Sequence, residues 1–202
     1  EVVRFAVPLD TIRRIRDLDL SADPRLDFAR DIFMFSFYSR GMSFVDVAYL
    51  NENDLKDDVV DYRRNKTGQH LLVIVTPQMR QLMEKYNKGG QYVFPLLSGG
   101  APTYLYKQYR AALWTTNRNL KKIGQMIGLK ITLTMNTARH SWATAAKDTG
   151  APLSAISDSL GHTSEKTTYF YLSELDQSML DRINMKIINF AEKWVLSCRC
   201  CS

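Results

Sequence analysis

The sequence predicts an α+β fold that is mainly α-helical and carries one small antiparallel β-sheet. Apolar residues recur at helical spacing over most of the 202 residues, and proline or glycine separates successive segments. A single stretch, 59–75, instead contains two β-rich runs on either side of a turn sequence. There is no internal repeat, and the length suits one large domain or two small ones with a proper core.

The first half of the chain is predicted to place a buried helix before a short one. Asp23 followed by proline is a strong helix start, and the segment after it is rich in apolar residues. The helix is expected to end near Arg40 and Gly41, where glycine lets the backbone turn. Ser43, with Asp46 three residues later, resembles a capping box that opens the short helix.

A β-hairpin is predicted from the segments 59–64 and 69–75. The sequence Asn-Lys-Thr-Gly at 65–68 lies between them and is typical of a turn. Lys66 is therefore expected at or near the tip of the hairpin.

Further helices are predicted after the hairpin, at 77–86, 103–126, 136–147, 152–160 and about 175–196. The polar side of the second is basic and carries Lys107, Arg110, Arg118, Lys121 and Lys122. That face could lie along DNA, or it could be an ordinary solvated face. The last helix has one apolar stripe, formed by Met179, Ile183, Ile187, Phe190 and Trp194.

Composition narrows the class of protein only in part. The net charge of +6 and the pI of about 9.2 suit an anionic partner, but many soluble proteins are equally basic. No apolar run is long enough to span a bilayer, so no membrane partner is expected. The three histidines lack acidic neighbours at ligand spacing, so no metal site is expected. All three cysteines, Cys198, Cys200 and Cys201, fall in a tail at 197–202 that we expect to be disordered. None of them can therefore cross-link the body of the fold, as is typical of a reduced, intracellular protein.

The residues that suggest chemistry lie between Thr134 and Leu172. In order, this stretch contains Arg139-His140-Ser141-Trp142, then Leu160-Gly161-His162, then Thr167-Thr168, and finally Tyr169 and Tyr171. Attack on a phosphodiester gathers negative charge on the non-bridging oxygens, and a protein that uses no metal must supply cations there, preferably arginines. With Arg40 and Lys66 upstream, the chain offers a nucleophile, phosphate clamps and a proton donor.

These motifs resemble those of the catalytic domain of tyrosine recombinases, the phage-type integrases, and the resemblance covers 1–196. It implies that Tyr171 attacks the phosphorus, that Arg40, Arg139 and His162 bind the phosphate, and that Lys66 protonates the leaving oxygen. It also implies a 3′-phosphotyrosyl intermediate that forms without metal, cofactor or ATP. Asn136 departs from the pattern, because the family has histidine there; an asparagine can position a phosphate but cannot exchange a proton near neutral pH.

The resemblance also implies partners and a setting. The partner is double-stranded DNA, with Arg63 and Arg64 as further, weaker candidates for phosphate contact beside the basic helix. The family usually carries a helical core-binding domain before this one, which we expect either to be absent from this chain or to have been trimmed away. We expect a monomer in solution and a homotetramer on paired DNA sites, in the prokaryotic cytoplasm with the nucleoid. The last helix could dock into a neighbouring protomer or fold back on its own domain.

Two other functions stay open at this point. A type IB topoisomerase shares the chemistry but reseals the strand without exchanging partners; the compact spacing of the motifs favours the recombinase. A DNA-binding relative with weakened catalysis is suggested only by Asn136.

Overall fold

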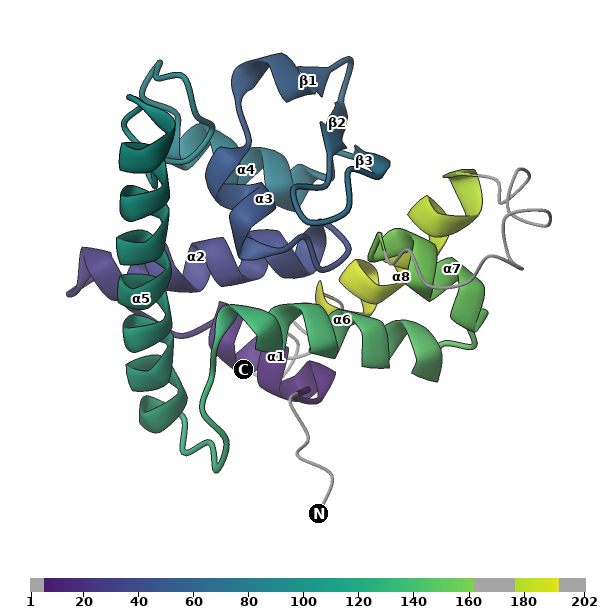
Figure 1. The fold of residues 1–202 in the computed structure, drawn as a ribbon. Helices are drawn as coiled ribbons and strands as arrows, with labels where there is room; N and C mark the ends of the chain where they lie inside the picture. The colour runs from purple at the N-terminus through teal and green to yellow at the C-terminus, as the bar shows by residue number, and fades with distance from the viewer. Residues whose placement is uncertain (1–5, 162–176, 193–202) are drawn as a thin grey trace.

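A computed structural model describes residues 6–161 and 177–192, and it confirms a mainly helical fold with a small antiparallel sheet (Figure 1). The helices are α1 (Leu9–Arg16), α2 (Pro24–Tyr38), α3 (Phe44–Tyr49), the 3-10 turn η1 (Glu52–Asp54), α4 (Pro77–Tyr86), α5 (Pro102–Met126), α6 (Met135–Asp148), α7 (Leu153–Ser159) and α8 (Gln177–Glu192). The strands are β1 (Leu55–Lys56), β2 (Val59–Arg63) and β3 (His70–Ile74). Within the described ranges, no helix is both long enough and apolar enough to cross a membrane.

Helix α2 lies at the centre of the core. Its start is set by Asp23, whose side chain accepts a hydrogen bond from the backbone N–H of Arg25 at 3.0 Å. Helices α4, α5 and α6 all pack against it, and three phenylalanines, Phe33, Phe35 and Phe37, are fully buried in the contact. Helix α5 runs along one side of the molecule and crosses near the start of α2 (Figure 1). The burial of α2 fixes the position of the turn that follows it.

The predicted hairpin is confirmed and has one more strand than expected. The strand order is β1-β2-β3, and neighbouring strands are antiparallel. Arg63 lies opposite His70 in the last pair before the turn that joins β2 to β3. Two backbone bonds close that turn: Arg64 N–H to the Gln69 carbonyl and Gly68 N–H to the Arg64 carbonyl, both at 2.8 Å. Strand β1 has only two residues, too few to give a periodic signal in an acidic segment.

Helix α8 folds back on its own domain, in contact with α1 and α6. The side chain of Asn184 accepts a hydrogen bond from the indole N–H of Trp142 at 3.1 Å and donates one to the Tyr38 carbonyl at 2.9 Å. Ile187 of the predicted stripe is fully buried, and Ile183 packs against the core. The side chains of Met179 and Phe190, and the whole of Trp194, lie outside the described residues. Of the two arrangements left open by the sequence, the described part of the helix adopts the one within a single chain.

Candidate functional site

Arg40 lies in the turn that ends α2, and its backbone is in the left-handed region. Its φ is 61°, and that of Gly41 is 73°, so two consecutive residues turn the chain sharply away from the helix. The side chain is 3% exposed and forms an ion pair with Asp181 of α8. Burial lowers the pKa of Arg40 to about 10, which leaves the guanidinium charged near neutral pH.

Arg139 of α6 joins the end of α2 to the end of α7. Its Nη1 donates to the Gly41 carbonyl at 2.8 Å, and its Nη2 donates to the Leu160 carbonyl. Gly41 has to be small here, because a Cβ would lie 3.1 Å from the Arg139 Cα. The pKa of Arg139 falls to about 10, first because the group is buried and then because Arg64 is near. The result is a half-buried cation in a fixed orientation.

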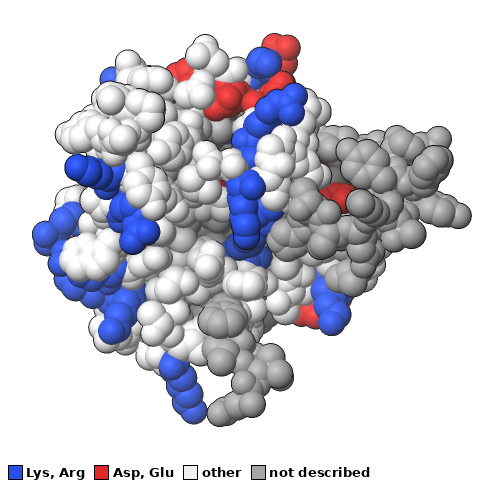
Figure 2. Space-filling view, in the orientation of Figure 1, with Lys and Arg blue, Asp and Glu red and all other residues white. Residues whose placement is uncertain are grey.

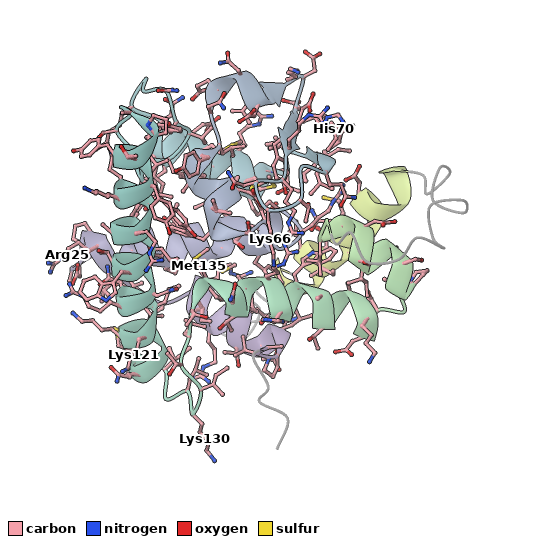
Figure 3. The ribbon with its side chains drawn as sticks, in the orientation of Figure 1. Arg25, Lys66, His70, Lys121, Lys130 and Met135 are labelled. Atoms are coloured by element: carbon pink, nitrogen blue, oxygen red, sulfur yellow. The ribbon has the colours of Figure 1, made fainter. Side chains whose placement is uncertain are left out.

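The turn between β2 and β3 contacts the Gly161 carbonyl, which directly follows the Leu160 carbonyl bound by Arg139. The Nη1 of Arg64 donates to the Gly161 carbonyl, and the Thr67 hydroxyl donates to the same oxygen at 3.2 Å. Lys66 lies between these two contacts and is exposed. Figure 3 shows Lys66 on the turn that reaches from the sheet toward α6. Adjacent carbonyls at 160 and 161 therefore bring Arg139 and the lysine-bearing turn together.

Asp46 is a site residue that the sequence did not reveal. It is buried, accepts a hydrogen bond from the Ser43 hydroxyl at 2.5 Å, and accepts another from the Asn65 backbone N–H at 2.8 Å. The expected capping box is absent, since the Ser43 side chain makes no cap bond to the α3 backbone. Instead, Asp46 holds the start of the hairpin turn. An acidic residue inside an otherwise apolar helix was the signal available for it.

Tyr62 of β2 shows how closely the charges gather. Burial raises its pKa well above the usual range, and the negative charge of Asp46 raises it further. The positive charges of Arg139, Arg64 and Arg40 act in the opposite direction. One buried phenol therefore senses three guanidinium groups that come from α6, the hairpin turn and the end of α2.

The remaining predicted catalytic residues are Asn136, which the structure describes, and two residues that follow Gly161. Asn136 is exposed in the first turn of α6, three residues before Arg139 and so on the same side of the helix. Gly161 has a φ of 63° and directly precedes His162. His162 and Tyr171 themselves lie outside the described residues. No group of three His, Cys, Asp or Glu side chains within 6–161 and 177–192 could hold a metal ion.

Basic side chains gather on the face that contains this site. Figure 2 shows one group of Lys and Arg over α5 and a second group in a column below the sheet. On α5 the basic residues expected from the sequence are all exposed: Lys107, Arg110, Arg118, Lys121 and Lys122. Trp114 of the same helix is 62% exposed, and the Arg118 guanidinium lies 4.8 Å from its ring centroid. The surface combines positive charge with exposed aromatic rings.

Comparison with known families decides what kind of domain this is. The profile described as "Phage integrase family" matches residues 26–178, a range that contains Arg40, Lys66, Asn136, Arg139 and Tyr171. The chain belongs to the phage integrase family. The resemblance seen in the sequence motifs is thereby confirmed at the level of the family.

Two curated proteins illustrate the similarity of this phage integrase domain. It is 29% identical over 159 residues to tyrosine recombinase XerC of Syntrophus aciditrophicus, which covers 72% of this chain and 51% of the relative. It is 31% identical over 148 residues to XerC of Rhodospirillum centenum, which covers 70% of this chain and 42% of the relative. The chain thus spans about half the length of these relatives.

Solved structures support the fold of this phage integrase domain. The XerH site-specific recombinase bound to difH substrate has a TM-score of 0.56 at 19% identity, covering 90% of this chain and 54% of that one. XerA recombinase has a TM-score of 0.52 at 17% identity, covering 88% of this chain and 62% of that one. The helical architecture with a small sheet is therefore that of a tyrosine recombinase catalytic domain.

Proposed function

We propose that this domain, assigned to 1–196, cleaves and rejoins DNA strands in site-specific recombination through a 3′-phosphotyrosyl intermediate. The observation that carries the proposal is the position of Arg139, a half-buried cation held by the Gly41 and Leu160 carbonyls beside the segment that leads into His162. Fixed cations of this kind are suited to the charge that builds up on a phosphate during displacement.

The proposed reaction divides the work among these residues. The phenolic oxygen of Tyr171 attacks the phosphorus, and the bond from phosphorus to the 5′ oxygen breaks as the new bond forms. Arg139, His162 and Arg40 bind the non-bridging oxygens, and Asn136 adds a neutral hydrogen bond. Lys66 gives a proton to the departing 5′ oxygen. The 5′ hydroxyl of a partner strand then reverses the step, so the bond energy is conserved without ATP, cofactor or metal.

In the structure, Arg40 is buried and already has an acidic partner. Its guanidinium is held by Asp181 of α8, so a phosphate and Asp181 would compete for the same cation. The ion pair with Asp181 therefore weakens the binding of a phosphate by Arg40 unless Asp181 moves away.

The partner we propose is double-stranded DNA. The exposed cations of α5 and Arg63, together with the exposed aromatic rings of α5, suit contact with phosphates and sugars rather than reading of bases. Arg64, the other candidate for such contact, is buried and faces the protein instead. We further propose a monomer in solution, with α8 in its own domain, and a homotetramer on paired sites in the prokaryotic cytoplasm.

A nicked DNA substrate tests the covalent step. We expect the protein to form an adduct that survives denaturant, and to do so in EDTA, because arginines rather than metal ions neutralise the phosphate. The adduct is measured on a denaturing gel. An absolute need for magnesium would contradict the mechanism. Joining of strands from two different sites, rather than relaxation of one supercoiled circle, separates recombination from topoisomerase activity.

Lys66 can be tested by changing the leaving atom. A DNA whose bridging 5′ oxygen is replaced by sulfur needs no protonation to depart, since a thiolate is a good leaving group. We expect Lys66→Ala to cleave normal DNA poorly and to recover most of its rate on the sulfur substrate. Equal impairment on both substrates would assign the lysine to binding.

A further inference from the structure

Arg64 is buried in a way that sets it apart from its neighbour Arg63. It is only 6% exposed, whereas Arg63 is exposed to solvent. Arginines are rarely buried to this degree unless their charge is hydrogen-bonded. The Arg64 Nη1 donates to the Gly161 carbonyl, and its Nε has no hydrogen-bond partner among the described residues. The side chain is directed inward to the segment before His162.

Hydrogen bonds to the Gly161 carbonyl fix the chain on both sides of Lys66. Arg64 begins the turn, where its own backbone bonds to Gln69 and Gly68, and its side chain reaches the Gly161 carbonyl. Thr67, directly after Lys66, reaches the same carbonyl from the other side at 3.2 Å. Lys66 therefore lies in the four-residue segment 64–67, and the side chains at both ends of this segment donate to the Gly161 carbonyl.

The absence of a side chain at Gly161 lets the segment 64–67 pack against its backbone. Its φ of 63° is one that glycine adopts without strain, and a Cβ at this position would lie 2.6 Å from the Arg64 Cδ. The same Cβ would lie 3.3 Å from the Leu71 Cδ1. The backbone at 161 thus packs directly against the stem of Arg64, which fixes the distance between the hairpin turn and the end of α7.

We propose that Arg64 is a positioning residue that holds Lys66 in register with Arg139 by binding the Gly161 carbonyl. This inference rests on the proposed function. Arg139 donates to the Leu160 carbonyl and Arg64 donates to the Gly161 carbonyl. The positions of Lys66, the proposed proton donor, and of Arg139, which is proposed to bind the phosphate, are therefore both set by the same peptide segment. Loss of the Arg64 contact lets the turn shift, and a displacement of about 1 Å can slow a reaction by as much as 10²-fold.

The test compares Arg64→Met with Arg63→Met on normal DNA and on the sulfur substrate. Methionine keeps an apolar stem but cannot bond to the carbonyl. We expect Arg64→Met to cleave normal DNA between about 10-fold and 100-fold more slowly at saturating DNA, to keep its DNA affinity, and to recover on the sulfur substrate. Arg63→Met, the matched control, should lose affinity and keep its rate at saturation.

Several outcomes would overturn the proposal. Equal slowing of Arg64→Met on both substrates would assign Arg64 to the phosphate or to general stability, and a loss of affinity like that of Arg63→Met would assign it to DNA contact. Should Arg64→Met fail to fold in a thermal melt, Thr67→Val removes the other bond to Gly161 and should show the same recovery on sulfur, to a smaller degree; no recovery there would overturn the inference. If the unmodified protein forms no adduct, the proposed function fails; if Lys66→Ala recovers and Arg64→Met does not, only this inference fails.

Discussion

Replacing Tyr171 with phenylalanine should abolish the covalent protein–DNA adduct. The substitution removes one oxygen, the atom that is expected to attack the phosphorus, and leaves the ring in place. Loss of a covalent nucleophile costs on the order of 10⁴-fold or more in rate, which would put the adduct below detection. The measurement is the fraction of labelled nicked DNA that becomes protein-linked after denaturation, with DNA affinity measured in parallel and expected to be unchanged.

Tyr169 supplies the matched control for this prediction. It lies two residues earlier in the same segment, so Tyr169→Phe makes the same chemical change without removing the expected nucleophile. We expect adduct formation to persist in that variant. Should Tyr171→Phe form the adduct while Tyr169→Phe does not, the nucleophile has been assigned to the wrong tyrosine.

Replacing Arg139 with alanine should reduce strand cleavage by about 10²-fold to 10³-fold at saturating DNA, as does removal of one preorganised charge donor. The loss has two physical parts. A cation that is proposed to bind the phosphate disappears, and the carbonyls of Gly41 and Leu160 lose their shared donor. Arg139→Lys keeps the charge but cannot span both carbonyls with a planar fork, so we expect it to recover only part of the rate.

Asn136 is the control on the same helix. Asn136→Ala removes a neutral, exposed side chain three residues away, and a neutral hydrogen bond contributes about 1 kcal/mol, or several-fold in rate. Single-turnover cleavage by the two variants, with a thermal melt of each, gives the comparison. A loss in Asn136→Ala as large as that in Arg139→Ala would mean that the family's usual histidine has been replaced by a residue with an equally essential role.

The sequence predicted the elements that local signals define. Proline and aspartate mark the start of α2, and the Asn-Lys-Thr-Gly turn places Lys66 at the end of the hairpin, as the structure confirms. Arg64 could have been assigned correctly from the same hairpin. Side chains alternate along a strand, so a position in phase with buried Val60 and Tyr62 faces the core.

Other features could not be predicted because they depend on distant segments. Asp46 reads as a helix cap when only its neighbours are considered, and its bond to the Asn65 backbone appears only once the hairpin packs on α3. The ion pair between Arg40 and Asp181 joins charges that lie at opposite ends of the chain. Neither charge has a local pattern that selects the other.

The hydrogen bonds that build the site also determine when the site comes into existence. Arg139 and Gly41 are 98 residues apart, Arg64 and Gly161 are 97 apart, and Asn184 and Tyr38 are 146 apart. Contacts over such separations slow folding, because the entropy of closing a long loop has to be lost before the contact forms. On the ribosome, a nascent chain that has passed Lys66 but not yet Gly161 carries an arginine and a lysine with nothing to align them. The proposed site therefore assembles only after the chain has been made as far as Gly161 and Asn184 and these segments have folded together.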